Sequence, residues 1–512
     1  MCLEKCVFIV FTLTMYRPEN KIQLSDLSVS RVYRGAEWML LIYCIWFSIS
    51  IAASQLFLLL FLALVFLGLY LDKVKTRKDV SSSIFSLSSI KKIISDGSTL
   101  SFDFYGPLII WVCVSFGACL LGFEPWRSIT QLLKLSIYFL VPIGVVVLVS
   151  GRERDGATRV SQIEKYFIML FFGQSLAAIH TVISVYSGYE IRPKIPGPVT
   201  ESGQIVLLFP LLIGMLHFRL RGHGFFLKKK LLLSFLLVFI PLVLFSWHRR
   251  FDLISSDVAV LLVLIAAAYA VYTAYRLFRN YRSGLFANMG GIVSVLAMVI
   301  FAAFVLNLKR GPWLAVVVEV VLFGLLFSRF TMITFLVVVF LCSLLPPVSE
   351  RIFTFAEHFF IGGGRFDMWK LGFQLIERFP MGIGYANSNL MREFDPTLPV
   401  LHRHMHNNVL NIALETGILG ALTFVWWFVH FILSGFRSYA RRCKQYFLKA
   451  HDQPHIIYVI LVLISIIGWQ TAGLVEYNFG DGEIRLLALV LIGLLLSAAT
   501  DADGEGRRKD RA

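Results

Sequence analysis

The sequence predicts an all-α protein: a polytopic transmembrane helical bundle of about 12–14 spans with one long, partly helical outer loop. Of its 512 residues, 57% are hydrophobic and only 16% are charged. The mean hydropathy is +0.74. The apolar residues gather into blocks of about 17–25, which is the length of a membrane-spanning helix. A helix satisfies its own backbone hydrogen-bonding groups, so repeated blocks of this length indicate a helical bundle.

Taken in order, the apolar blocks predict about fourteen spans. The first pair, Trp38 to Leu71, fits either one long tilted helix or a tight hairpin. We favour the hairpin because it places both of its ends on the same, more basic side. The predicted spans centre near residues 44, 62, 113, 140, 177, 211, 239, 267, 299, 320, 338, 424, 466 and 491.

The charge distribution sets the predicted orientation. The net charge is +16, and 33 of the 48 Lys and Arg residues fall in segments that alternate spans place inside. This bias is typical of membrane topology and argues against nucleic acid as a partner. The predicted organisation is an inner segment 1–36, spans one to eleven in 37–347, an outer loop 348–407, spans twelve to fourteen in 408–498, and an inner tail 499–512.

The outer loop 348–407 has a helical pattern of its own. Apolar residues recur at helical spacing between Arg365 and Phe379, and Pro380 then ends the pattern. We expect an amphipathic helix on the outer membrane surface, with its apolar face toward lipid or the bundle. Those apolar residues are Phe366, Trp369, Phe373 and Ile376.

Arginines in the outer segments are candidate ligands for phosphate. A guanidinium group stays charged and binds phosphate through a bidentate fork. A single outer arginine is better explained by contact with lipid phosphates, whereas several that converge would suit a diphosphate. The outer arginines are Arg192, Arg249, Arg250, Arg310, Arg365 and Arg485.

Three histidines alternate at the end of the outer loop: His402, His404 and His406. Three imidazoles can bind zinc, but the only nearby carboxylates are Glu393 and Asp395, and we predict neither a metal nor a cofactor. A histidine at the membrane rim can instead act as a general base. It can also simply cap the following helix.

The residues from His406 to Gly420 fit the pattern H-[N/S/Q]-x9-G-x-x-[G/T/Y], which resembles the signature of bacterial O-antigen ligases. Close variants occur in the wider O-antigen ligase and polymerase superfamily. Four other segments, all predicted outside, resemble family motifs in the same order, over roughly residues 190–495. They are Arg365 to Trp369 with Pro380 to Gly384 (R-x-x-x-W and P-x-G-x-G), Lys309-Arg310-Gly311 (S-R-G with Lys for Ser), Val475 to Asp481, and Arg192 to Gly203.

The resemblance implies a metal-independent glycosyltransferase at the periplasmic face of a bacterial inner membrane. The charge bias then makes both termini cytoplasmic. Its donor would be an undecaprenyl-diphosphate-linked glycan, held beside membrane lipid. The acceptor would be lipid A-core for a ligase, or a second lipid-linked glycan for a polymerase; the pattern at His406 favours the ligase. The implied roles are His406 as the base, Arg310, Arg365 and Arg192 as diphosphate ligands, and Asn407, Glu415 and His404 as supporting residues.

A flippase or other transporter of lipid-linked glycans is the less favoured alternative. Such a protein should show internal repeats and ionisable or broken helices at the membrane midplane. The sequence shows no repeat, and few ionisable residues lie within the predicted spans: Lys134, His180 and Glu319.

Overall fold

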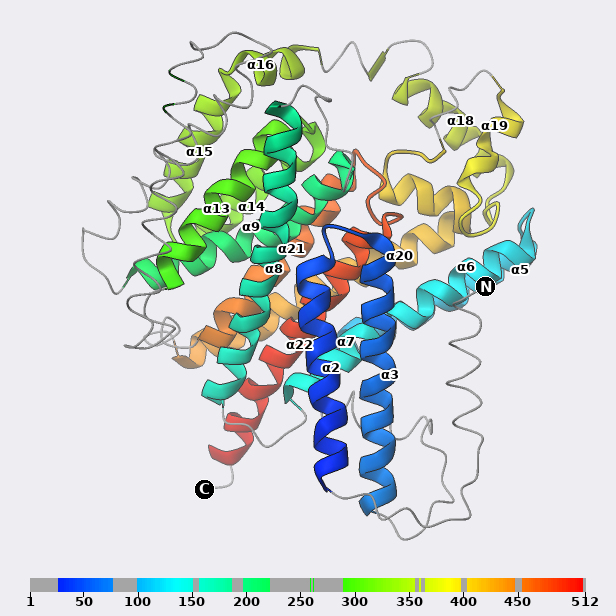
Figure 1. The fold of residues 1–512 in the computed structure, drawn as a ribbon. Helices are drawn as coiled ribbons and strands as arrows, with labels where there is room; N and C mark the ends of the chain where they lie inside the picture. Colours follow the sequence, from blue (N-terminus) through cyan, green and yellow to red (C-terminus); the bar gives the residue numbers. More distant parts are fainter. Residues whose placement is uncertain are drawn as a thin grey trace.

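The computed structural model describes residues 26–76, 99–150, 156–186, 197–221, 258, 261, 289–354, 359–360, 364–396, 403–446 and 454–509. Within these ranges the chain is helical and contains no strand (Figure 1). The predicted all-α polytopic bundle is therefore confirmed. The helices of the long loop (α16, α18 and α19) lie at the top of Figure 1, whereas the last helix, α22, runs toward its bottom.

The predicted N-terminal hairpin is present. Helices α2 (Asp26–Trp46) and α3 (Ile51–Thr76) pack against each other along their length. The Ser48 hydroxyl in the turn between them donates a hydrogen bond to the Gly173 carbonyl at 2.8 Å. Helix α2 begins well before residue 37, where the first predicted span began. The apolar pattern missed its first turns because they carry polar residues.

The remaining helices account for most of the other predicted spans. Seven described helices are long and apolar enough to cross a membrane, or eight if the bent pair α15 and α16 is one span. The spans predicted near residues 239 and 267 lie outside the described residues. The helices are α5 (Thr99–Leu121), α6 (Pro125–Tyr138), α7 (Val141–Ser150), α8 (Gly156–Tyr186), α9 (Pro198–Arg221), α13 (Met289–Leu306), α14 (Arg310–Leu326), α15 (Arg329–Ser343), α16 (Pro346–Phe353), α18 (Arg365–Arg378), α19 (Met391–Phe394), α20 (Asn408–Tyr446), α21 (Pro454–Ala472) and α22 (Gly482–Lys509).

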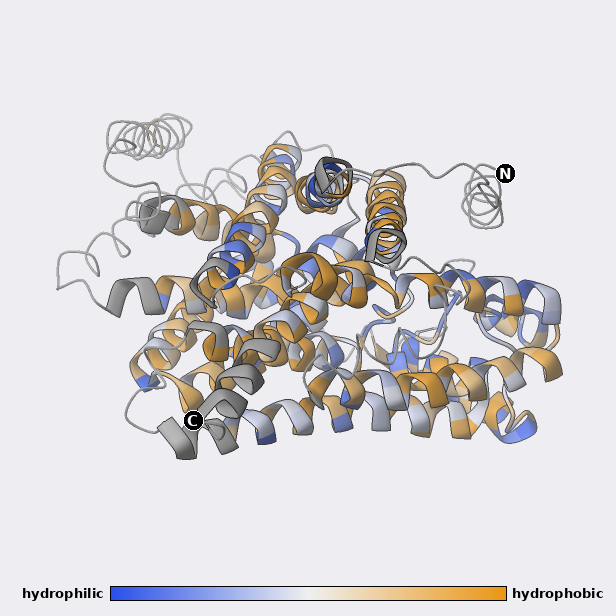
Figure 2. Cartoon of the chain, turned by 90° about the horizontal axis from the view of Figure 1, so that it is seen from below, coloured by the Kyte–Doolittle hydropathy of each residue, from blue (hydrophilic) through white to orange (hydrophobic). Residues whose placement is uncertain are grey.

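The outside of the bundle is apolar. Large hydrophobic side chains such as Phe330, Phe340 and Leu422 are more than half exposed, as expected where a helix faces lipid rather than water. Figure 2 shows hydrophobic residues along most helices, with hydrophilic residues gathered at helix ends and in loops. The polar residues of interest are therefore concentrated where the chain leaves the helices.

Helix α18 confirms the helix predicted after Arg365. Its buried side consists of Met368, Gly372 and Leu375, which pack in a small apolar cluster with Met405 and Leu414. Phe366 and Phe373, which the pattern placed on the apolar face, are half exposed. The helix thus uses one apolar strip to pack on the protein and leaves another strip open.

Helix α20 is broken near its start, where the loop after α18 packs on it. Gly417 has φ +76° and ψ 178°, a conformation that only glycine adopts without strain. The carbonyls of Leu414 and Glu415 accept hydrogen bonds from the backbone of Ile383 and Gly384 (both 2.9 Å), and Ile418 donates to Pro380 at 3.1 Å. A Cβ atom on Gly417 would clash with the Pro380 carbonyl oxygen.

Candidate functional site

The histidine segment, residues 403–407, is held in a fixed position by side chains from two helices. The Trp369 indole of α18 donates a hydrogen bond to the Met405 carbonyl at 2.8 Å. The Asn411 amide oxygen of α20 accepts from the Met405 backbone N–H at 3.0 Å. His406 itself has a left-handed backbone with φ +47°. Non-glycine residues in this region are uncommon and concentrate at functional sites.

Asn407 caps the first turn of α20. Its side-chain oxygen accepts from the Leu410 backbone N–H at 3.0 Å, and its amide donates to the Leu474 carbonyl at 2.7 Å. The oxygen therefore satisfies one of the unpaired donors at the helix start, so this helix is capped by Asn407 rather than by a histidine. The bond to Leu474 also ties the histidine segment to the turn between α21 and α22.

That turn, residues 473–481, is anchored by aromatic packing and by amides. The Phe479 ring lies 4.9 Å from Phe424 and 6.0 Å from Trp469, measured between ring centroids. The Asn408 side chain accepts from the Phe479 backbone N–H at 3.0 Å and donates to Asn478 at 2.8 Å. These contacts fix the position of the intervening residues, including Glu476.

Glu476 lies at the centre of the site. One carboxylate oxygen accepts from the Arg365 guanidinium at 2.8 Å, and the other lies 3.1 Å from His406 Nδ1. Only 8% of Glu476 is exposed. Burial alone would raise its pKa, but the hydrogen bond from His406 and the charges of Arg365 and Lys309 lower the pKa to about 2.

This geometry determines the tautomer of a neutral His406. A carboxylate with a pKa of about 2 is ionised at neutral pH and can only accept hydrogen bonds. His406 Nδ1, 3.1 Å away, must therefore carry the proton of that bond. A neutral imidazole then has its lone pair on Nε2, the atom that can take a proton from another molecule.

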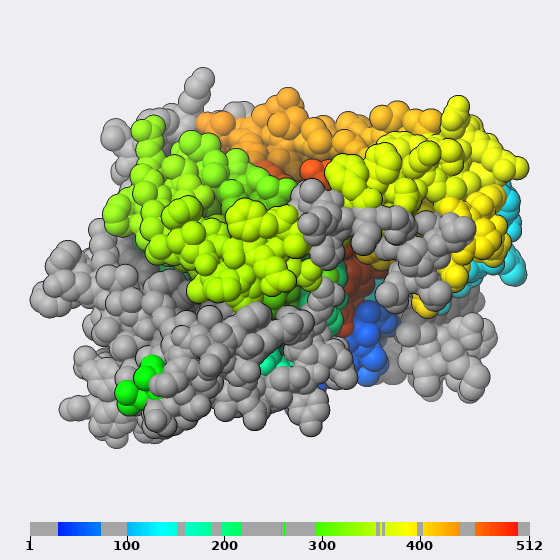
Figure 3. Space-filling view, turned by 90° about the horizontal axis from the view of Figure 1, so that it is seen from above, coloured from blue at the N-terminus to red at the C-terminus, as the bar shows by residue number. Residues whose placement is uncertain are grey.

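Basic side chains surround this carboxylate. Arg310, the first residue of α14, donates to the Thr354 hydroxyl at 2.9 Å. The charges of Arg351 and Arg365 both act on Arg310, and the charge of Lys309 acts on Glu476. Figure 3 shows C-terminal residues, in orange-red, between the green residues that lead to α16 and the yellow residues of α18 and α19. We refer to Lys309, Arg310, Arg351 and Arg365 as the basic cluster.

The structure brings together most, but not all, of the predicted site residues. Arg310, Arg365, His406 and Asn407 meet as described, and the His404 ring lies 4.3 Å from the His406 ring. The Glu415 side chain instead lines a separate cavity; its backbone carbonyl, through Gly384, supports the loop before the site. The other two, Arg192 and His402, lie outside the described residues.

Sequence reasoning missed the central acid. Glu476 was part of the Val475 to Asp481 segment, but nothing in the sequence links it to a histidine 70 residues away. A signal was present, since a carboxylate in a short turn between two apolar blocks is costly unless it is paired. No trio of metal-ligating side chains occurs in the part of the chain that the structure describes.

The fold and this site define a multi-pass α-helical membrane protein with a basic, histidine-containing centre at its helix ends. Residues 293–425 match the family model described as O-Antigen ligase. The match covers about a quarter of the chain and supports membership of the O-antigen ligase superfamily, whose members are glycosyltransferase-like enzymes that act on lipid-linked glycans. The family and the apolar helices together indicate a bacterial inner membrane protein.

The family match covers α13 through the first half of α20. It includes Arg310, Arg365 and His406, but it ends before Glu476. The comparison with curated proteins found no match. The central carboxylate of the site is thus supplied by a part of the chain that the family match does not reach.

Proposed function

We propose that this protein is an O-antigen ligase-type glycosyltransferase. It transfers a glycan from an undecaprenyl-diphosphate carrier to a lipid A-core acceptor at the periplasmic face of the membrane. The observation that carries the proposal is the linkage Arg365–Glu476–His406, with contacts of 2.8 and 3.1 Å, beside the basic cluster. The linkage supplies an oriented base, and the cluster supplies charge for a diphosphate leaving group.

His406 acts as the general base. Its Nε2 takes the proton of an acceptor hydroxyl while the hydroxyl oxygen forms a bond to the anomeric carbon of the donor sugar. The bond between that carbon and the phosphate oxygen breaks at the same centre, and the lipid diphosphate leaves. Glu476 keeps Nδ1 protonated and stabilises the positive charge that develops on the ring, as a carboxylate does in other base–carboxylate pairs.

The basic cluster binds the diphosphate. The charges of Arg365 and Lys309 act on Glu476, and those of Arg351 and Arg365 act on Arg310, so positive charge is concentrated beside His406. Arg310 and Arg365 are the ligands that we assign, and Arg192 is proposed to join them. Preorganised positive groups stabilise charge that grows on a leaving group more than they stabilise the ground state.

The test is a transfer assay with the purified full-length protein and its His406→Ala variant, with chelator present throughout. The donor is an undecaprenyl-diphosphate glycan, offered with either lipid A-core or a second lipid-linked repeat unit. We expect a rate loss of about two to four orders of magnitude for the variant. His430→Ala is the control, because His430 lies farther along the chain on α20 and pairs with Asp103 at 3.3 Å, away from the site.

The acceptor arms separate the two members of the superfamily. Transfer to lipid A-core supports the ligase, and transfer only to the second lipid-linked unit assigns the chain to the polymerases. Unchanged transfer by a well-folded His406→Ala protein removes His406 from the mechanism. Binding of the donor without transfer to either acceptor contradicts the proposed enzyme and favours transport.

A further inference from the structure

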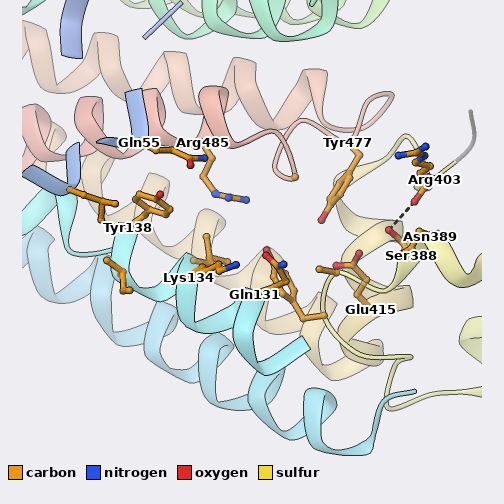
Figure 4. A pocket seen from close by; sticks show the side chains of 16 residues that line it. Gln55, Gln131, Lys134, Tyr138, Ser388, Asn389, Arg403, Glu415, Tyr477 and Arg485 are labelled. Carbon is orange, nitrogen blue, oxygen red and sulfur yellow. Dashed lines mark hydrogen bonds between the residues drawn. The ribbon is translucent and has the colours of Figure 1, made fainter. Parts of the chain in front are cut away.

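A polar cavity lies beside the 473–481 turn, with Tyr477 and Gly480 of that turn in its lining. Its volume is about 730 Å³, within the range of pockets that bind small ligands (roughly 300–1,000 Å³). Figure 4 shows side chains from α3, α6, α20, α22 and the loop after α18 around a common space. None of His406, Arg310 and Arg365 lines it, so this cavity is distinct from the site described above.

The cavity has an excess of positive charge. Lys134, Arg403 and Arg485 line it, against the single carboxylate of Glu415. In Figure 4, Lys134 and Arg485 extend into the central space from different elements. Lys134 lies in the candidate span Pro125–Ser150. An ammonium group at that position is costly in lipid and is stable when it faces a wet, polar space.

Two buried polar atoms at the cavity have no hydrogen-bond partner among the described residues. They are Arg485 Nε and Glu415 Oε2, and Glu415 is 1% exposed. The Arg485 side chain is otherwise fixed, because its Nη1 donates to the Phe479 carbonyl at 2.7 Å. Buried polar groups in folded proteins are almost always paired, so these unpaired atoms indicate a ligand or water that supplies the missing partners.

The other polar groups of the lining suit a saccharide. The side chains of Gln55, Gln131 and Asn389 offer both donors and acceptors, as sugar hydroxyls require. Ser388, also in the lining, already donates to the Arg403 carbonyl at 3.1 Å, which fixes the backbone there. The lining therefore combines anion-binding groups with neutral groups that both donate and accept hydrogen bonds.

Aromatic contacts link the cavity to His406. Tyr477 lines the cavity and directly follows Glu476. The His404 ring lies 5.4 Å from the Tyr477 ring and 4.3 Å from the His406 ring. Two rings, Tyr477 and His404, thus connect the cavity to His406.

We propose that this cavity binds an anionic sugar unit, one that carries a phosphate or carboxylate group, of the glycan acceptor. Lys134 and Arg403 bind the anionic group, and the neutral amides bind the hydroxyls. The role of acceptor rests on the proposed function, since it requires a transfer reaction at His406. The binding of an anionic saccharide does not, because it follows from the lining alone.

The test is a binding titration with the full-length protein in nanodiscs, using three probes. They are a trisaccharide with one phosphate monoester, the same trisaccharide without phosphate, and undecaprenyl diphosphate without sugar. We expect the phosphorylated trisaccharide to bind more tightly than the neutral one. Lys134→Gln and Arg403→Gln should each weaken that binding roughly 10- to 100-fold, the loss expected for one charge-assisted hydrogen bond.

The control removes an equivalent charge outside the cavity. Lys370→Gln, at an exposed position of α18, should leave the affinity for the phosphorylated trisaccharide unchanged. Saturating undecaprenyl diphosphate should leave that affinity unchanged as well. Equal binding of the two trisaccharides, insensitivity to Lys134→Gln and Arg403→Gln, or displacement by undecaprenyl diphosphate would each overturn the proposal.

The lipid probe separates this proposal from the proposed function. Arg365→Gln should weaken binding of undecaprenyl diphosphate and leave the phosphorylated trisaccharide bound. If Arg365→Gln has no effect on the lipid, the diphosphate assignment fails while the cavity stands. If only the cavity variants lack effect, the cavity assignment fails while the catalytic site stands.

Discussion

Replacement of Glu476 by glutamine tests the catalytic arrangement most directly, because the side chain keeps its shape and loses its charge. A pKa of about 2, compared with an ordinary 4.5, means that the surroundings favour the ionised carboxylate by about 3 kcal/mol. In Glu476→Gln that stabilisation is absent. The amide must also turn an N–H₂ group toward one of two donors, Arg365 or His406.

If the N–H₂ group of the glutamine faces His406, Nδ1 must accept a hydrogen bond. The ring proton then lies on Nε2, and Nε2 can no longer act as a base. We therefore expect the rate of glycan transfer by Glu476→Gln to fall by roughly two to four orders of magnitude, the range associated with loss of a base or of its correct tautomer. Binding of undecaprenyl diphosphate should fall much less, because Arg310 remains in place.

The assay is transfer from an undecaprenyl-diphosphate glycan under single-turnover conditions, beside donor binding by the same preparation. Glu37→Gln is the matched control, since Glu37 forms an exposed ion pair with Lys165 at 3.0 Å; such pairs contribute little. A folded Glu476→Gln protein that transfers glycan at the parent rate would refute the pairing of Glu476 with a catalytic His406.

Three further predictions follow from the same contacts. Gly417→Ala should lower the thermal unfolding temperature, because an alanine at φ +76° reduces the free energy of unfolding by about 1–3 kcal/mol or more. Gly117→Ala should leave the unfolding temperature unchanged, because there is open space around the new Cβ. Arg310→Gln should weaken binding of undecaprenyl diphosphate roughly tenfold or more in a titration, and equal affinity would contradict its assigned role. Because the pKa of Glu476 is lowered to about 2, the ionised carboxylate stabilises the fold fully above about pH 4.5, and this stabilisation is lost as the pH falls toward 2. The difference in unfolding temperature between the parent and Glu476→Gln should therefore shrink over that interval. A difference that persists at pH 2 would contradict the low pKa.

Local features of the fold were predictable from the sequence. Apolar spacing identified the helix that begins at Arg365, and Pro380 correctly ended it, because both depend on neighbouring residues. The break of α20 at Gly417 was not predictable in this way, because the φ of Gly417 depends on how a distant loop packs against it.

The site itself could be predicted only in part. Arg310, Arg365 and His406 each stood in a recognisable segment, but their convergence depends on how the helices pack. Glu476 pairs with Arg365 across 111 residues of sequence, and no local pattern contains that distance. The cavity around Lys134 is a similar case, since its lining comes from elements that are distant in the chain.

The break at Gly417 also bears on how the protein responds to its bilayer. The carbonyls of Leu414 and Glu415 accept hydrogen bonds from the 380–384 loop, and Ile418 donates to it, at the point where a continuous helix would bond to its own next turn. A change in bilayer thickness alters the tilt of a spanning helix, and here that tilt acts on residues 418–446. The helical hydrogen bonds of α20 are interrupted at Gly417, so a change of tilt in residues 418–446 is not passed on to residues 408–416. This first segment can therefore keep its distance to Glu476 while the rest of the helix adjusts to membranes of different thickness.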